Sequence, residues 1–226
     1  MKKIISFSLW GNNEIYTIGA IKNALIAKDK YPDFECWFYI HYETVPINII
    51  EQLQIMTNVH IIPKSGNLNT VKPMMWRFEA IDDPNVEIMM PRDTDTRILD
   101  REVQAVNDWL NSNTLFHIMR DHPCHSHKIL GGMFGTKKLP NIPNWKIHID
   151  KFIQKGHRNY DISFLDSFVY PLIKNNCTIH ASFFKYEQNC KNFPSPFIDF
   201  HHVGEYVFAN DTRSATHIKI LKRGKK

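Results

Sequence analysis

The first 97 residues alternate between short apolar runs and segments with helical periodicity, and this alternation constrains the fold more than any other feature of the sequence. The apolar runs predict strands, and the segments between them place apolar residues on one face of a helix. The expected strands are 3–9, 35–41, 59–62 and 86–91, and the expected helices are 14–28, 46–54 and about 71–81. Strands that alternate with helices predict an α/β fold, in which a mostly parallel, twisted sheet is flanked by helices.

The second half of the chain is less regular, and no linker separates it from the first half. We therefore expect a single domain over residues 1–210, with halves of about 1–97 and 98–210. The remaining residues, 211–226, form a basic tail that we expect to be a frayed, solvated terminus. Further expected helices are 100–110, 145–154 and 162–174, further expected strands are 115–119, 129–135 (broken by glycines) and 178–183, and residues 197–208 close the fold.

Composition and charge exclude several classes of function. The chain has 226 residues and a net charge of +5, and outside the tail it mixes both signs of charge, which argues against a dedicated nucleic-acid binder. The four cysteines include no Cys-x-x-Cys pair, which is typical of reduced, intracellular proteins. The N-terminal apolar run is broken at Gly11 and is too short for a signal peptide or a transmembrane segment, so we expect a cytoplasmic protein.

Two carboxylates, Asp93 and Asp95, directly follow the expected strand 86–91. Residues two apart in extended or turning backbone point the same way, so both side chains can converge beyond the carboxyl end of the strand, where open α/β sheets bind ligands. Carboxylates held together repel each other unless a cation lies between them, and hard oxygen ligands favour Mg²⁺ or Mn²⁺ shared with substrate phosphates. The alternative interpretation of so short a motif is an ordinary polar loop.

Glycine-rich phosphate-binding loops are absent from the sequence. Neither Gly-x-Gly-x-x-Gly nor the Walker lysine loop is present, which disfavours Rossmann dehydrogenases and P-loop ATPases. Without such a cradle, bound phosphates need another positive partner, and a metal ion at the carboxylate pair would supply it.

The order of these motifs resembles a known family. The segments of this chain that resemble the family are Arg92-Asp93-Thr94-Asp95-Thr96-Arg97, residues 116–123 (Phe-His-Ile-Met-Arg-Asp-His-Pro) and residues 201–204 (His-His-Val-Gly). The chain is similar, from about residue 5 to about residue 208, to glycosyltransferases of the GT-A fold, in particular the glycogenin and galactosyltransferase-like group and small viral and bacterial glycosyltransferases. The resemblance implies a nucleotide-binding half followed by a half for the sugar and the acceptor.

The same resemblance implies a metal-dependent enzyme that transfers a sugar from a nucleotide diphosphate sugar, with a UDP-sugar favoured, to a glycan or another hydroxyl acceptor. Tyr16 would stack on the nucleotide base, although an aromatic residue at a helix start can also belong to the core. Lys72 or Arg77 would contact the donor diphosphate or sugar, unless these are solvated helix charges. The other donor-binding positions that the resemblance implies are Leu9, Trp10, Asn12, Asp93, Thr94, Gly131, Gly132 and Gly204.

The metal ligands that the resemblance implies are Asp93, Asp95 and His201, with His202 as the alternative to His201. The metal would be Mn²⁺ or Mg²⁺. One departure from the family weakens the phosphate site, because Glu205-Tyr206-Val207 stands where the family has a Lys-Pro-Trp segment.

Three residues are candidates for a base that accepts the proton of the acceptor hydroxyl: Asp121, His122 and Asp161. An inverting enzyme needs such a base, whereas a retaining enzyme can rely on positioning alone, and the resemblance leans toward retention. The family has a glutamine after the aspartate where this chain has Ile162. The polar loop 120–127 has three interpretations: it lines the sugar or acceptor pocket, it is a plain surface loop, or it binds zinc, although its ligands are spaced too tightly for an ordinary zinc site.

Two other classes of function share some of these features. A nucleotidyltransferase or another nucleotide-sugar-processing enzyme would share the sheet and the aspartate pair, but it usually needs a basic, glycine-rich loop near the N-terminus that this chain lacks. A non-catalytic module that binds nucleotide sugars would bind the donor without turnover.

Overall fold

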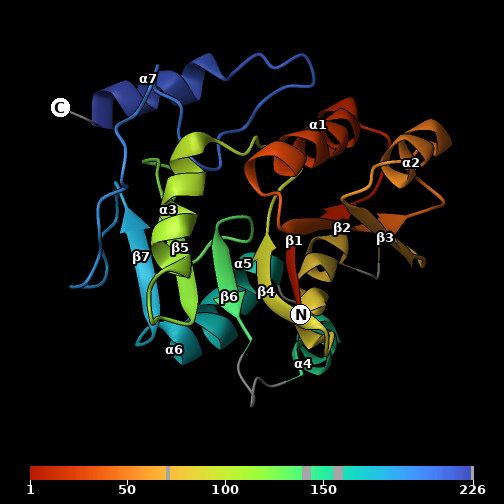
Figure 1. Cartoon of the computed structure of the whole chain (residues 1–226), viewed down its shortest axis with the longest axis horizontal. Coiled ribbons are helices and arrows are strands. Elements are labelled where there is room, and N and C mark those ends of the chain that lie inside the picture. The colour runs from red at the N-terminus through yellow and green to blue at the C-terminus, as the bar shows by residue number, and fades with distance from the viewer. Residues whose placement is uncertain (70–71, 139–143, 155–159, 225–226) are drawn as a thin grey trace.

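The computed structural model describes residues 1–69, 72–138, 144–154 and 160–224, and its centre is a seven-stranded sheet (Figure 1). The strands lie in the order β3-β2-β1-β4-β6-β5-β7. Their bounds are β1 (Lys2–Leu9), β2 (Phe34–His41), β3 (Val59–Lys64), β4 (Val86–Pro91), β5 (Phe116–Arg120), β6 (Phe134–Lys137) and β7 (Cys177–Ala181). The helices are α1 (Glu14–Lys30), α2 (Ile47–Gln54), the 3-10 helix η1 (Pro73–Asp82), α3 (Asp100–Leu110), α4 (Trp145–Gln154), α5 (Tyr160–Phe164), the π-helical η2 (Leu165–Val169), α6 (Tyr170–Ile173) and α7 (Ala215–Gly224).

The sheet is mixed and mostly parallel, which confirms the predicted fold class. Strands β3, β2, β1 and β4 pair in parallel, as do β5 and β7, and β6 runs antiparallel between β4 and β5. Because β1 and β4 are parallel neighbours, the segments that leave their carboxyl ends begin side by side. The pairing of Ser6 with Pro91 and the hydrogen bond from the amide of Arg92 to the carbonyl of Ser6 (2.9 Å) bring the loop after β4 next to the end of β1.

Two hydrophobic layers, one on each face of the sheet, form the core. One layer packs the sheet against α1, α2 and α3, and the other packs it against η1, α4, α5, η2 and α6. The central strands are therefore buried on both faces, which is why the sequence shows them as nearly continuous apolar runs. Within the first layer, the rings of Phe7 and Phe38 stack with their centroids 4.6 Å apart.

Several predicted elements differ from the structure. The helix expected near 71–81 is a 3-10 helix that begins at Pro73, and Val71 lies outside the described residues. The strand expected over 129–135 is limited to β6, and the glycines before it form a turn. The helix expected over 162–174 is divided by the π-helical segment η2, which inserts into the α-helical ladder. By contrast, the predicted bounds of strand 86–91 and of helices 100–110 and 145–154 are confirmed.

The prediction of a frayed basic tail is wrong for the described part of that segment. Residues 215–224 form helix α7, and Leu221 on this helix is fully buried. Gly224 lies so close to Pro123 and Phe183 that an added Cβ would be 2.8 Å and 3.1 Å from their ring atoms. The helix is amphipathic, and burial of its apolar side against the domain outweighs the fraying that its basic composition predicts.

None of the helices in the described ranges has the length and apolarity that crossing a membrane requires. All four cysteines (Cys36, Cys124, Cys177 and Cys190) are free thiols.

We predict that Leu221→Ala lowers the free energy of unfolding by about 2–5 kcal/mol, because it removes a fully buried leucine side chain and leaves a cavity. Urea denaturation followed by circular dichroism measures this change. Lys219→Ala is the matched control on the exposed side of the same helix, and its effect should stay within about 0.5 kcal/mol. Equal effects of the two variants would show that α7 does not pack against the domain.

Candidate functional site

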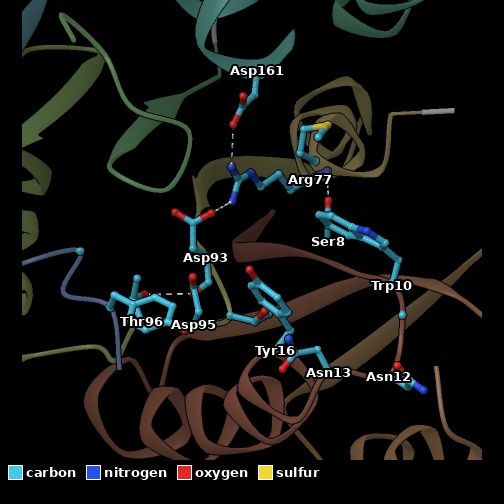
Figure 2. A pocket seen from close by; sticks show the side chains of 15 residues that line it. Ser8, Trp10, Asn12, Asn13, Tyr16, Arg77, Asp93, Asp95, Thr96 and Asp161 are labelled. Atoms are coloured by element: carbon cyan, nitrogen blue, oxygen red, sulfur yellow. Dashed lines mark hydrogen bonds and ion pairs between the residues drawn. The ribbon is translucent and has the colours of Figure 1, made fainter. Parts of the chain in front are cut away.

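A cavity of about 650 Å³ lies at the carboxyl ends of β1 and β4 (Figure 2). Its volume is within the range of ordinary small-molecule sites. It is bordered by the loop after β1, the start of α1, the helix η1, the loop after β4, the first turn of α5 and the segment around residue 205. The lining residues are Ser8, Trp10, Gly11, Asn12, Asn13, Tyr16, Met74, Arg77, Asp93, Thr94, Asp95, Thr96, Asp161, Gly204 and Tyr206.

The guanidinium of Arg77 lies between Asp93 and Asp161 (Figure 2). Its Nη1 donates to Asp93 Oδ1 and to the carbonyl of Arg92 (3.1 Å), and its Nη2 lies 3.5 Å from Asp161 Oδ2. The backbone amide of Arg77 donates to Ser8 Oγ (3.0 Å), which fixes η1 to the end of β1. Burial acts to lower the pKa of Arg77, but the two carboxylates outweigh it and the pKa is raised.

Asp95 shares the cavity with Asp93 and has an unusual protonation equilibrium. Burial, and then the charge of Asp93, raise the pKa of Asp95 to about 6. The two carboxylates therefore interact electrostatically, as their spacing predicts. Tyr16 is 41% exposed and lines the same cavity, so it is not a core residue; burial raises its pKa, and Asp95 contributes to the shift.

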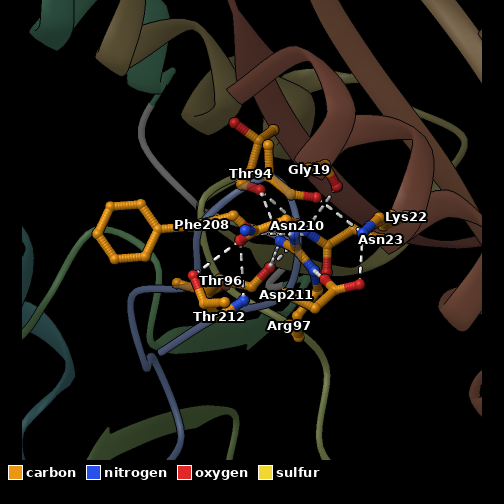
Figure 3. Close-up of polar contacts among 11 residues, drawn as sticks. Gly19, Lys22, Asn23, Thr94, Thr96, Arg97, Phe208, Asn210, Asp211 and Thr212 are labelled. Atoms are coloured by element: carbon orange, nitrogen blue, oxygen red, sulfur yellow. Dashed lines mark hydrogen bonds and ion pairs between the residues drawn. The ribbon is translucent and has the colours of Figure 1, made fainter. Parts of the chain in front are cut away.

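The loop that carries both carboxylates is held from behind by side chains of α1 and by its own arginine (Figure 3). Asn23 Nδ2 donates to the carbonyls of Thr94 (3.2 Å) and Thr96 (2.8 Å), and Arg97 Nη1 donates to the carbonyl of Thr96 (2.8 Å). A Cβ on Gly19 would lie 2.0 Å from the carbonyl oxygen of Thr94, so only glycine lets α1 approach this closely. We did not predict a role for Asn23 or Gly19, because in the sequence they are only an asparagine and a glycine within an expected helix.

The two neighbouring glycines, Gly131 and Gly132, pack against the charged side chains of the site. A Cβ on Gly132 would lie 2.0 Å from Asp93 Oδ2, and a Cβ on Gly131 would lie 2.4 Å from Arg77 Nη2. From the sequence, we expected these glycines to contact the donor. In the structure they let the side chains of Arg77 and Asp93 lie directly on the backbone, so they position the site.

Other predicted donor-binding residues divide into two groups. Trp10, Asn12, Thr94 and Gly204 line the cavity. The side chain of Leu9 is fully buried in the core, and that of Lys72 lies outside the cavity lining. The Nζ of Lys72 donates to the carbonyl of Asn69 (3.1 Å) and lies 4.6 Å from the ring centroid of Tyr160.

The structure places His201, the expected third metal ligand, in a different cavity from Asp93 and Asp95. His201 lines a second cavity on the other side of the segment 201–207, and its Nδ1 bonds Glu205 (2.8 Å). His202, the alternative, is buried and stacks on His122 with ring centroids 4.3 Å apart. In the described ranges, three His, Cys, Asp or Glu side chains nowhere converge as a set of metal ligands.

Asp93 and Asp95 nevertheless fit Mg²⁺ or Mn²⁺ as a pair. They supply two hard oxygen donors on one loop of an open cavity, which is the number of protein ligands that these ions often take when substrate phosphates and water complete the shell.

The carboxylate of Asp121, the first candidate base, is fully buried, and both of its oxygens accept hydrogen bonds. Arg101 donates to both oxygens (2.8 Å each), and Ser182 Oγ (2.5 Å) and the amide of Val203 (2.9 Å) add further hydrogen bonds. Asp121 therefore joins α3 to the segment around residue 203.

The ring of His122, the second candidate base, is also occupied by hydrogen bonds. Its Nε2 donates to the carbonyl of His217 (2.9 Å), and its Nδ1 accepts from the amide of Cys124 (3.0 Å), so both ring nitrogens are used. It belongs to a cluster of four histidines that joins the loop after β5 to the C-terminal segment: His122, His125, His202 and His217. Asp161 is the one candidate base that reaches the cavity.

Comparison with known proteins shows the fold. No protein-family model and no curated protein matches the sequence. A glycosyltransferase involved in the glycosylation of the major capsid of PBCV-1 superposes with a TM-score of 0.51 at 13% identity, over 80% of this chain and 82% of that chain. The galactosyltransferase LgtC with donor and acceptor sugar analogs superposes with a TM-score of 0.50 at 11% identity, over 78% of this chain and 73% of that chain.

An active-site mutant of LgtC covers more of the chain, with a TM-score of 0.51 at 10% identity over 98% of this chain and 95% of that chain. A weaker likeness, with a TM-score of 0.48 at 12% identity over 86% of this chain and 91% of that chain, is to the 4-diphosphocytidyl-2C-methyl-D-erythritolsynthase from Anaerococcus prevotii. The chain therefore has a GT-A-like fold, that of nucleotide-diphospho-sugar transferases.

We predict that acid destabilises the protein through its buried histidines. Burial lowers the pKa of His180 to about 4, of His125 to about 3 and of His202 to about 2, from an ordinary value of 6.5. Below pH 6.5 the unfolded chain binds protons that the folded chain does not, so stability is full above that pH and is lost as the pH falls toward these values, by up to about 1.4 kcal/mol per pH unit for each histidine. The raised pKa of Asp95 makes the folded chain more stable as the pH falls, but this is one group against three histidines.

Urea denaturation at pH 7, 6 and 5 measures this dependence. His202→Phe keeps an aromatic ring in the stack and should reduce the loss of stability between pH 7 and 5. A free energy of unfolding that stays constant over this range in the parent protein would show that protonation of these histidines is not linked to unfolding.

Proposed function

We propose that this protein is a glycosyltransferase that takes its sugar from a nucleotide diphosphate sugar, with a UDP-sugar favoured, and transfers it to a hydroxyl group of a glycan or another acceptor. The proposal rests on one observation above all. The carboxylates of Asp93 and Asp95 lie in a cavity of about 650 Å³ at the carboxyl end of β4, within a GT-A-like fold.

The charge of the cavity supports a role for a metal ion. Among the lining residues, three carboxylates (Asp93, Asp95 and Asp161) face a single guanidinium, that of Arg77. A diphosphate placed in this cavity would be repelled by the excess of negative charge. Mg²⁺ or Mn²⁺ held by Asp93 and Asp95 would reverse this repulsion and would stabilise the charge that grows on the leaving diphosphate.

The chain's own residues would do the remaining work. Tyr16 would stack on the nucleotide base, and its exposure at the cavity wall supports this role. Arg77 holds Asp93 and Asp161 in fixed positions, and its buried charge is available to a donor oxygen. Gly131 and Gly132 leave no side chain between the backbone and this cluster.

The placement of the candidate bases favours a retaining reaction. Asp121 and His122 are occupied elsewhere, and Asp161 is paired with Arg77. A retaining transfer can rely on positioning of the donor and the acceptor. It therefore does not require Asp161 to act as a base, whereas an inverting transfer would.

We expect the protein to release nucleoside diphosphate from at least one member of a panel of nucleotide sugars when Mn²⁺ is present. Asp95→Asn keeps the shape of the side chain but removes its charge, and it should abolish Mn²⁺-dependent donor binding in calorimetry. The exposed Asp33→Asn is the matched control and should bind like the parent protein.

The products distinguish the competing functions. Release of pyrophosphate would instead indicate a nucleotidyltransferase, and donor binding without turnover at any acceptor would indicate a binding module. Donor affinity that is equal in the parent protein and in Asp95→Asn would refute the metal-diphosphate site.

A second prediction concerns Gly132. In Gly132→Ala the new Cβ would overlap Asp93 Oδ2, so the carboxylate must move away from its present position. Because small misplacements in active sites are costly, we expect turnover to fall about 10- to 100-fold. Circular dichroism should show a folded protein, and unchanged turnover in a folded variant would show that the position of Asp93 does not matter.

A further inference from the structure

A second cavity, of about 400 Å³, lies behind the loop that carries Asp93 and Asp95. It is bordered by α1, by the end of the carboxylate loop and by the segment 201–213. Its lining residues are Lys22, Leu25, Ile26, Arg97, Leu99, His201, Glu205, Val207, Asp211 and Arg213. None of them lines the first cavity.

One thin wall separates the two cavities. In the segment 201–207, Gly204 and Tyr206 face the first cavity, whereas Glu205 and Val207 face the second. The wall is joined to the carboxylate loop by the hydrogen bond from the amide of Val207 to the carbonyl of Asp95 (2.8 Å).

The body of the second cavity is apolar. Leu25, Ile26, Leu99 and Val207 form its walls. Leu25 is 54% exposed although it belongs to a helix that packs on the sheet, so its side chain is not used by the core.

The charged groups of this cavity are not balanced. Three cations, Lys22, Arg97 and Arg213, face two carboxylates, Glu205 and Asp211. Lys22 and Arg97 share the single carboxylate of Asp211, whose side chain is 55% exposed (Figure 3).

Arg213 retains an unused donor. It donates from Nε to Glu205 Oε1 (2.7 Å) and from Nη1 to the carbonyl of Asp199 (2.9 Å). Its buried Nη2 has no hydrogen-bond partner among the described residues. A buried donor without a partner costs free energy, so the side chain of Arg213 would gain by turning Nη2 toward an anion in the cavity that it lines.

We propose that this second cavity binds a small amphipathic monocarboxylate, with its apolar chain against Leu25 and Ile26 and its carboxylate near Arg213 and the Lys22–Arg97 pair. An apolar body with one negative end matches the apolar walls and the excess of one positive charge. The bound molecule would contact Arg97, which also holds the carboxylate loop through the carbonyl of Thr96. The site does not depend on the proposed transferase activity, because binding is measured without a donor sugar or a metal ion.

Decanoate is the probe, and isothermal titration calorimetry on the full chain measures its binding below its micellar concentration. We expect saturable binding at one site per chain, and binding at least tenfold weaker for decanol and for decylamine, which have a neutral and a cationic end. Absence of saturable decanoate binding, or equal binding of the three probes, would overturn the proposal.

Leu25→Glu places a negative charge at the apolar wall and should weaken decanoate binding at least tenfold. Leu172→Glu is the matched control, since Leu172 is a helical leucine of similar exposure (59%) outside both cavities. Both variants should keep the melting temperature of the parent protein. If Leu25→Glu binds decanoate as tightly as Leu172→Glu does, the probe binds elsewhere and the proposed site is refuted.

Discussion

The buried guanidinium of Arg77 holds together the parts of the chain that form the candidate site. Its partners are Asp93 from the loop after β4 and Asp161 from the first turn of α5, two segments far apart in the sequence. The backbone amide of Arg77 adds a hydrogen bond to Ser8 at the end of β1. A buried cation without such partners would carry a large desolvation cost, so the two carboxylates and the arginine depend on each other. Burial and the charge of Asp93 raise the pKa of Asp95, although Arg77 and Arg97 act to lower it.

The wall between the two cavities explains how the fold positions Asp95. Asn23 on α1 and the backbone amide of Val207 hold carbonyl groups of the carboxylate loop. The loop's own Arg97 holds the carbonyl of Thr96 as well. The same wall explains why His201 is not near the carboxylates. The segment 201–207 alternates its residues between the two sides, and the register places Gly204 and Tyr206, not His201, toward Asp95.

Local patterns made much of the fold predictable from the sequence. The bounds of strand 86–91 follow from its local apolar pattern, and β4 has these bounds in the structure. The side chains of Asp93 and Asp95, two residues apart, line the same cavity. The apolar spacing of residues 100–110 likewise gave helix α3 with its predicted bounds.

The sequence was least informative for residues whose role is decided by distant partners. Asp121 has the sequence context of a polar pocket loop, but Arg101 and Val203 occupy its oxygens. The basic tail has the composition of a frayed end, but burial of Leu221 holds it as a helix. Long-range pairing of this kind leaves no periodicity in the sequence, which is why it could not be anticipated.

The central claim is that a divalent cation binds between Asp93 and Asp95. Anomalous diffraction from crystals soaked with Mn²⁺ and uridine diphosphate tests it most directly. The account predicts one strong manganese peak in contact with the carboxylates of Asp93 and Asp95 and with oxygens of the diphosphate. A structure with the diphosphate bound and no manganese at these carboxylates, or with manganese only at the histidine cluster around His122, would contradict it.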